Sequence, residues 1–474
     1  MSLQPGCAGC LKGDEGVKIE KHSIGFVPLS ERYGNEHRLF TIWFSINLSI
    51  VCLTVGTLGI LAGLDLSWTL LALVLGNAIG TVFMAAHSAQ GPHLGIPQMI
   101  QSRAQFGVLG AAIPLLAVIV TYTLYMSADE VVVKATIMSL IPVSANTAMI
   151  GFGVATLIVA FVGYELIHRI GVYLTVLSGL LFLATGILLI SGAAPHADPV
   201  QAVDHGFVLA TFMATLTQAT AWSLTFGPYV ADYSRYLRPE ISTARTFWYT
   251  AMGNFLGATL IMCLGAYMAA HYARIAADPG VGIASLFGRV NFVVRALIVF
   301  GVFQAGVMNL YSAYMSVSTV FTGFRNRGHV SKSMKFLVMS AVIFFATAIA
   351  IFSQHDFHHY FGDMLDIMVY VLVPWSAINL ADYYFVRNGS YNVKDMFDLN
   401  GLYGRFNWST IAIYFLAVVI QAPFARLSFY TGVIAQQIGA DTAWIPGLIV
   451  PAVLYCVIER RRVQAEWAPE ESGA

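Results

Sequence analysis

Two stretches decide the fold: FSINLSIVCLTVGTLG at residues 44–59 and TQATAWSLTFGPYVADYSRYL at residues 217–237. Both are largely apolar, yet each carries polar or helix-weakening residues in its middle, such as Asn47 and Ser49 in the first and Pro228 in the second. Such residues are tolerated at membrane depth where the backbone faces protein or a water-filled cavity. The two stretches therefore predict two broken membrane helices.

The rest of the chain is equally suited to lipid. Of its 474 residues 57% are hydrophobic and 11% are charged, and the mean hydropathy is +0.71. Apolar runs of about 20 residues recur along the chain, and such runs form helices because lipid offers the backbone no hydrogen-bond partners. We therefore expect an all-α polytopic membrane protein of about twelve spans, with no room for a soluble enzyme domain. The expected spans are 39–62, 66–90, 107–140, 148–166, 170–192, 207–234, 247–271, 292–321, 336–353, 364–386, 408–425 and 431–458.

The basic residues sort to one side of this arrangement. With the N-terminus inside, 20 of the 25 Lys and Arg residues fall on the inner side, and five lie in the spans or on the other side. The exceptions are Lys134, Arg274, Arg289, Arg295 and Arg426. The positive-inside rule then predicts a cytoplasmic-membrane protein with both termini cytoplasmic. The head of the chain has no apolar stretch with a small-residue cleavage site, so no signal peptide is expected.

The two broken spans are the first and the sixth. This spacing is typical of transporters built from two inverted five-helix repeats, although glycine-rich packing of unbroken helices is the alternative. The expected organisation is a cytoplasmic tail at 1–38, repeats at 39–192 and 193–391, two peripheral helices within 392–458, and a tail at 459–474.

Three motifs resemble one known family. GPHLGIPQMIQSRAQFGVLGAAIP at 91–114, FGPYVADYSRYLRP at 226–239 and NLADYYFVRNGSY at 379–391 resemble the purine/cytosine permease group of the nucleobase:cation symporter-1 family. The resemblance covers residues 30 to about 400. It implies a leucine-transporter-type fold of two inverted five-helix repeats plus two peripheral helices, with alternating access around a midplane site between helices 1, 3, 6 and 8.

The third span carries a carboxylate at membrane depth. Tyr122, Tyr125 and Asp129 follow at helical spacing and share one face. Glu130 is expected to pair with Lys134, four residues on, whereas Asp129 has no such local partner, and an unpaired carboxylate at this depth indicates function. Packing between helices is the alternative. The resemblance implies that Tyr125 stacks on a base and that Asp129 binds its edge, although relatives typically carry Trp and an amide there.

Further binding residues are expected at both breaks and in the eighth span. The resemblance implies an aromatic ring at the sixth-span break, for which Trp222 is the candidate, with Ser223 as the alternative register and Thr225 beside them. Asn309, in NLYS, can read a base edge because an amide both donates and accepts. Asn47 and Ser49 of the first span would complete the site.

The coupling ion follows from a departure from the family pattern. Sodium-coupled relatives place Ser and Thr hydroxyls ahead of the eighth-span asparagine, but residues 300–308 read FGVFQAGVM. Hard cations prefer oxygen ligands, so a proton is favoured over sodium, with Asp129 as its carrier. Sodium stays open as the alternative.

No resident cofactor, metal or nucleic-acid partner is predicted. Cys7 and Cys10 form a single CxxC, and His355, His358 and His359 form a loop cluster, but neither has a further ligand pair. The expected partners are a nucleobase and the bilayer; no feature specifies an oligomeric state. Another planar heterocycle, such as a hydantoin, allantoin or a vitamin pyrimidine, is the alternative substrate. A membrane-embedded enzyme or a channel is the alternative class, but HExxH and Walker motifs are lacking.

Overall fold

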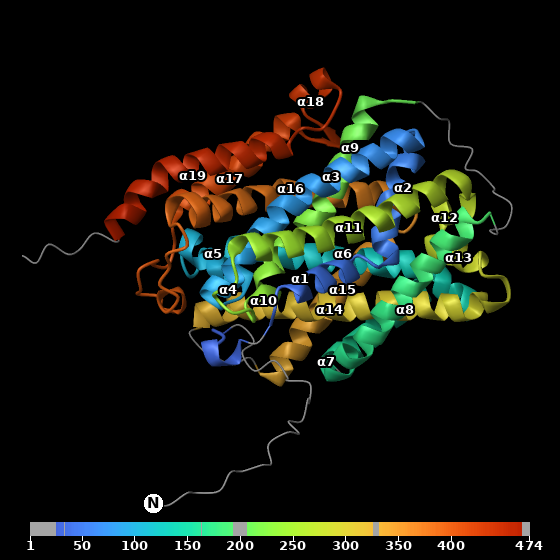
Figure 1. The fold of residues 1–474 in the computed structure, drawn as a ribbon, viewed down its shortest axis with the longest axis horizontal. Helices are drawn as coiled ribbons and strands as arrows, with labels where there is room; N and C mark the ends of the chain where they lie inside the picture. The colour runs from blue at the N-terminus through green and yellow to red at the C-terminus, as the bar shows by residue number, and fades with distance from the viewer. Residues whose placement is uncertain (1–24, 33, 163, 193–205, 326–330, 467–474) are drawn as a thin grey trace, which may run out of the picture.

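The computed structural model describes residues 25–32, 34–162, 164–192, 206–325 and 331–466 (Figure 1). This part of the chain is almost wholly helical, with one antiparallel hairpin formed by β1 (Arg426–Leu427) and β2 (Tyr430–Thr431). Cys7 and Cys10 lie outside the described residues. The α-helices are α1 (His37–Ile46), α2 (Ile50–Leu61), α3 (Leu66–Ala86), α4 (Gln90–Leu94), α5 (Gln98–Phe106), α6 (Ala112–Leu140), α7 (Ala145–Val162), α8 (Tyr164–Ile190), α9 (Leu209–Leu224), α10 (Val230–Ser234), α11 (Thr243–His271), α12 (Ala273–Ala277), α13 (Pro279–Ser285), α14 (Asn291–Arg325), α15 (Lys332–Ser353), α16 (Phe357–Ala381), α17 (Trp408–Gln421), α18 (Val433–Ile438) and α19 (Trp444–Glu466).

The prediction of an all-α polytopic protein is confirmed. Seven described helices are long and apolar enough to cross a membrane, and the bent pair α1 and α2 makes an eighth. Every predicted span contains at least one helix. The last span was misplaced: residues 431–443 hold the end of the hairpin and the short helix α18, and the long helix α19 begins only at Trp444. The apolar composition of the hairpin region made it look like part of a span.

The first predicted break is present. Helix α1 ends at Asn47, and α2 begins after Ser49, whose backbone is extended and whose hydroxyl accepts a hydrogen bond from the Cys52 N–H at 3.1 Å. The axes of the two helices differ by 60°. Asn and Ser suit these positions because their side chains satisfy the backbone groups that a helix end exposes. The prediction of a broken first span is confirmed.

The second predicted break is also present. Helix α9 ends at Leu224, a 3-10 turn spans Gly227–Tyr229, and α10 follows. Pro228 lies in the first positions of that turn, where its missing N–H costs no helical hydrogen bond. Thr225 caps α9, and its hydroxyl donates to the Trp222 carbonyl at 2.8 Å. Local chemistry at both breaks therefore explains why the helices stop there.

The helices pack as two groups, with the broken helices in the first. That group contains α1, α2, α3, α9 and α11, and the second contains α6, α7, α14 and α15. Glycines let the first group approach closely: a Cβ at Gly56 would lie 2.0 Å from the Met262 carbonyl oxygen, and one at Gly76 would lie 2.3 Å from that of Leu216. Small residues drive this kind of packing in membranes, where there is no hydrophobic force between helices.

The two ends of the bundle differ. One end, here the α5 face, holds α4, α5, α10 and the C-terminal end of α16, and the other, the α13 face, holds α12, α13 and the start of α16 (Figure 1). Helices α4 and α5 were not predicted, because they lie in the polar stretch after the second span. Asp232 of α10 holds α5 by accepting from the Gln98 N–H at 2.8 Å. Beyond α16 the chain continues as a π-helix, Asp382–Val386.

Candidate substrate site

The face predicted on the third span meets the eighth-span asparagine. Asp129 on α6 is 3% exposed, and its Oδ2 accepts a hydrogen bond from the Asn309 amide of α14 at 3.2 Å. Asn309 itself is only partly buried. An amide–carboxylate pair offers both acceptors and donors at one place, as recognition of a heterocycle edge requires. The two residues expected to bind the substrate edge are therefore neighbours.

Tyr125 reaches the break in the sixth span. Its hydroxyl lies 2.8 Å from that of Thr225, and its ring meets the ring of Trp222 edge-on, with centroids 5.6 Å apart. Tyr125 and Trp222 are 9% and 5% exposed. Both rings are thus shielded from bulk solvent, where aromatic contacts gain about 1 kcal/mol beyond the area they bury.

Asn47 joins the two breaks. Its Oδ1 accepts a hydrogen bond from the Trp222 indole N–H at 2.7 Å, and its Nδ2 donates to the Trp43 carbonyl at 2.7 Å. The same amide nitrogen donates to Asn254 Oδ1 on α11 at 3.1 Å. Asn47 is fully buried, so these contacts are made away from water. One side chain therefore ties the end of α1 to the indole beside the break in α9.

Ser223 and Ser49, two of the predicted substrate-binding residues, make their hydrogen bonds away from Tyr125 and Trp222. The hydroxyl of Ser223 donates to Asn77 Oδ1 on α3 at 3.1 Å and accepts from the Asn254 amide at 2.9 Å. The hydroxyl of Ser49 caps α2. The register at the sixth-span break therefore places Trp222, and not Ser223, beside Tyr125.

Several rings near the site were not predicted. Phe226 meets Trp222 edge-on at 5.8 Å, and Tyr229 lies 5.7 Å from the ring of Tyr122. Trp43 of α1 lies 5.7 Å from the ring of Phe226. These rings extend the aromatic cluster toward the α5 face. The FGPY motif held the signal, because a tight turn at a predicted break brings its two flanking rings together.

The expected pairing of Glu130 with Lys134 is wrong. Glu130 instead accepts a hydrogen bond from the Thr347 hydroxyl on α15 at 2.9 Å, and Lys134 donates to the Gln354 carbonyl at 3.2 Å. Glu130 is 1% exposed, and its Oε2 has no hydrogen-bond partner among the described residues. Contacts between helices override the local spacing rule here.

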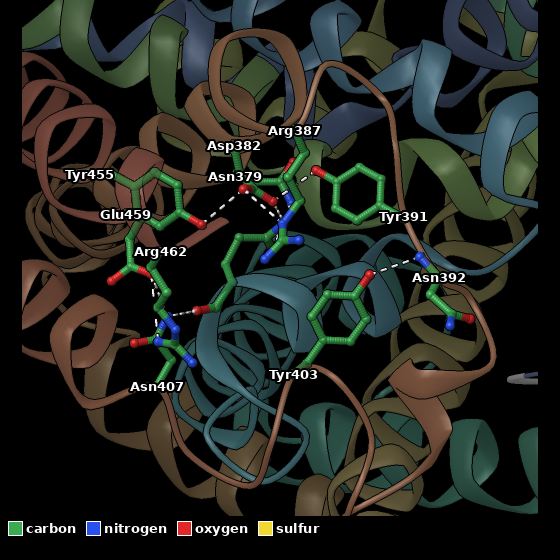
Figure 2. A network of polar contacts seen from close by, with 11 residues as sticks. Asn379, Asp382, Arg387, Tyr391, Asn392, Tyr403, Asn407, Tyr455, Glu459 and Arg462 are labelled. Carbon is green, nitrogen blue, oxygen red and sulfur yellow. Dashed lines mark hydrogen bonds and ion pairs between the residues drawn. The ribbon is translucent and has the colours of Figure 1, made fainter. Parts of the chain in front are cut away.

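A polar network closes the α5 face around Asp382 (Figure 2). Asp382 forms an ion pair with Arg387 at 3.2 Å, and both side chains are buried. It also accepts hydrogen bonds from Gln105 of α5 at 2.6 Å, from Tyr391 at 2.8 Å and from Tyr455 of α19 at 2.9 Å. It links the end of α16 to both α5 and a peripheral helix.

A second part of this network surrounds His87 at the end of α3. Its Nδ1 lies 3.0 Å from Asn379 Oδ1 and its Nε2 lies 2.9 Å from the Ser376 hydroxyl, both on α16. The imidazole stacks on Trp375 with centroids 5.0 Å apart. Gln90 donates to the same Asn379 oxygen at 2.7 Å. Helix α16 is therefore held to the segment after α3 along its last two turns.

Comparison with known sequences identifies the family. Residues 26–445 match the family described as permeases for cytosine/purines, uracil, thiamine and allantoin. The protein named "putative purine-cytosine permease YxlA" of Bacillus subtilis is 38% identical over 450 residues, 94% of this chain and 97% of that protein. The purine-cytosine permease FCY2 of Saccharomyces cerevisiae is 25% identical over 412 residues, 80% of this chain and 74% of that protein.

A solved structure shares the fold. Mhp1, a nucleobase-cation-symport-1 family transporter in a closed conformation with bromovinylhydantoin bound, matches with a TM-score of 0.72 at 16% identity, over 94% of this chain and 95% of that one. This likeness confirms the predicted leucine-transporter-type fold class. Together with the sequence matches, it shows that the chain is a multi-pass membrane transport protein and not an enzyme, and that it belongs to the purine/cytosine permease group of the nucleobase:cation symporter-1 family.

Proposed function

We propose that this protein imports a nucleobase, a purine or cytosine, by symport with a cation, and that the cation is a proton. The observation that carries the proposal is the meeting of both helix breaks with the Asp129–Asn309 pair. Asn47, Trp222 and Thr225 come from the breaks, and Tyr125 connects them to α6. Discontinuous helices facing a shared midplane site are the usual architecture of secondary transporters.

A flat, polar-edged ring suits this site. The rings of Tyr125 and Trp222 supply apolar faces for stacking, and the Asp129–Asn309 pair supplies acceptors and an N–H donor for an edge. An acidic acceptor favours a ring that presents N–H or amino donors. Ser223 and Ser49 act through the helix contacts they make and not through the substrate.

A proton fits the residues better than sodium does. Asp129 is a carboxylate at membrane depth whose described hydrogen-bond donor is the neutral amide of Asn309. Isolated charges at this depth are costly, so proton binding and release at this group would be coupled to its surroundings. Ahead of Asn309, residues 300–308 carry no hydroxyl ligand for a hard cation.

Alternating access would move the two helix groups relative to each other, with residues 39–192 and 193–391 as the inverted halves. We place the α5 face on the cytoplasmic side of the cytoplasmic membrane, because the predicted inside cations Arg103, Arg235 and Arg387 lie there. Both termini are then cytoplasmic.

The alternative substrate is another planar heterocycle. The family description includes thiamine and allantoin, and the Mhp1 structure holds a hydantoin. The same stacking and edge contacts would serve these rings. A thermal-shift screen of nucleobases, hydantoins, allantoin and pyrimidine vitamins on the purified protein separates the substrates.

Uptake into proteoliposomes tests the mechanism. We expect accumulation of a labelled nucleobase driven by an inward proton gradient and abolished by a protonophore, with no dependence on sodium. Asp129→Asn should fold, but its proton-driven uptake should fall about tenfold or more, the equivalent of 1.4 kcal/mol, and lose its pH dependence. Unchanged uptake across pH would remove Asp129 from the mechanism.

A second variant tests the edge contact. Asn309→Ala removes the amide beside Asp129, so the nucleobase Kd should rise about tenfold. Asn291→Ala is the matched control, since Asn291 begins the same helix and its amide only donates to the Gly288 carbonyl at 2.8 Å. Equal affinities for the two variants would count against Asn309 as a substrate contact.

A further inference from the structure

A second buried carboxylate lies on α16, between the α13 face and the substrate site. Asp366 is 4% exposed, and its Oδ1 has no hydrogen-bond partner among the described residues. The amide of Gln218, on α9, lies beside this carboxylate. Gln218 precedes Trp222 by four residues, so it lies one helical turn from the indole of the substrate site.

A glycine makes this contact possible. Gly362 lies one turn before Asp366 on α16, and a Cβ placed there would lie 2.8 Å from Gln218 Nε2. The amide of Gln218 therefore lies against the backbone of α16, one turn before the Asp366 carboxylate. Helix α9 is the first half of the broken sixth span, so Asp366 lies where α16 closes against a discontinuous helix.

The groups that surround Asp366 are acidic. Asp363 and Tyr370 lie one turn away on the same helix, and Asp441, before α19, accepts a hydrogen bond from the Tyr370 hydroxyl. Asp363 and Asp441 have donors of their own: Ser428 N–H donates to Asp363 at 2.9 Å, and Asp441 accepts from the backbone N–H groups of Ala443 and Arg426 at 3.0 and 2.6 Å and from the Tyr370 hydroxyl.

No described cation reaches Asp366 to balance these charges. The guanidinium of Arg426, the basic side chain nearest in sequence to this loop, is directed to the Gly439 carbonyl at 3.1 Å and is exposed. Among the described residues no group of three or more His, Cys, Asp or Glu is arranged to hold a metal ion. A proton is therefore the cation that this carboxylate can accept without further ligands.

We propose that Asp366 is a second proton-binding residue of the transport cycle, which links proton entry from the α13 face to closure of α16 against α9. The inference rests on the proposed nucleobase–proton symport. When a proton from water binds the Asp366 carboxylate, the group becomes neutral and its repulsion by Asp363 and Asp441 is removed. The neutral group can then stay buried where α16 packs against α9, next to the substrate site. Release of that proton to water restores the charge and reopens the contact.

Asp366→Asn tests this assignment, since the amide keeps the shape but binds no proton. The readouts are nucleobase accumulation, proton uptake followed with a trapped pH dye, and counterflow exchange. Counterflow swaps nucleobase across the membrane and needs no proton gradient. We expect proton-driven accumulation to fall about tenfold and its pH dependence to flatten, while exchange stays within about twofold. Asp356→Asn is the matched control, because Asp356 is exposed at the start of the same helix and its side chain makes no cap.

The outcomes separate this inference from the proposed function. If the wild-type protein does not accumulate nucleobase on a proton gradient, the proposed function fails and takes this inference with it. If the wild-type protein does so and Asp366→Asn keeps the wild-type proton uptake and pH profile, only the role of Asp366 is overturned.

A second variant covers the case in which Asp366→Asn does not fold. Gly362→Ala crowds the Gln218 amide and leaves the carboxylate in place. Displacing this amide changes the surroundings of the carboxylate and should move the pH of half-maximal uptake by about half a unit or more. A midpoint identical to that of the wild type would overturn the assignment.

Discussion

The hydrogen bond between the Trp222 indole and Asn47 is the contact most open to a direct test. It joins the two helix breaks at 2.7 Å, and Asn47 is fully buried. Trp222→Phe keeps an aromatic ring but leaves Asn47 Oδ1 without this donor. A buried polar atom without a partner costs about 1–3 kcal/mol. At 1.4 kcal/mol per tenfold, the nucleobase Kd should rise by about fivefold to 150-fold if binding requires this geometry.

Trp43→Phe is the matched control. Trp43 is also fully buried in the aromatic cluster, but its indole N–H has no hydrogen-bond partner among the described residues. Both variants lose a similar volume, so the extra loss in Trp222→Phe reports the hydrogen bond. The assays are thermal unfolding of the purified protein and binding of the nucleobase found by screening.

A double-mutant cycle completes the test. If the bond couples the two breaks, Asn47→Ala combined with Trp222→Phe should cost about 1 kcal/mol less than the sum of the single variants. Additive effects, or equal losses in Trp222→Phe and Trp43→Phe, would refute the claim that this contact holds the breaks together.

Two further predictions concern stability. Arg387→Ala leaves Asp382 buried without its cation and should destabilise the protein by about 3–5 kcal/mol; adding Asp382→Asn should recover part of this loss in a thermal melt, and failure to recover any would count against the ion pair. Gly80→Ala would place a Cβ 2.4 Å from the Thr220 carbonyl oxygen and force α3 away from α9, at a cost of about 1–3 kcal/mol. Gly186→Ala, with nothing within 4 Å of the new Cβ, is the control and should melt no lower than the wild type.

Both breaks could be predicted from the sequence because their causes are local. Asn47 and Ser49 cap helix ends, and Pro228 starts a turn, whatever the rest of the fold does. Hydrophobic length likewise predicts most spans. The helices α4 and α5 could not be predicted in this way. All of α5 and all of α4 except His93 is buried, and partners of these helices lie almost three hundred residues away, as the contact of Gln105 with Asp382 shows.

In the candidate site, too, the local features could be predicted and the contacts between distant residues could not. Helical spacing places Tyr125 and Asp129 on one face, but only the packing of α6 on α14 brings Asn309 to that face. The pairing of Glu130 failed because Thr347 of α15 is nearer than the residue four positions along its own helix. Asp366 was not predicted, because it lies near the start of the expected span, where an acidic residue is usually interfacial. Only the structure shows that it is buried.

The partners of the buried carboxylates separate structural groups from proton carriers. Asp382 has a guanidinium and three side-chain donors, and Asp441 has two backbone N–H groups and a tyrosine hydroxyl, so both anions are compensated where they lie. Asp129 accepts a hydrogen bond from the neutral amide of Asn309, and Asp366 lies beside the neutral amide of Gln218. An amide can accept from a carboxylic acid as well as donate to a carboxylate. An amide neighbour is therefore compatible with both protonation states of the carboxyl group, whereas a structural ion pair is not. A proton can bind and dissociate at these two positions while the surrounding helix contacts stay in place.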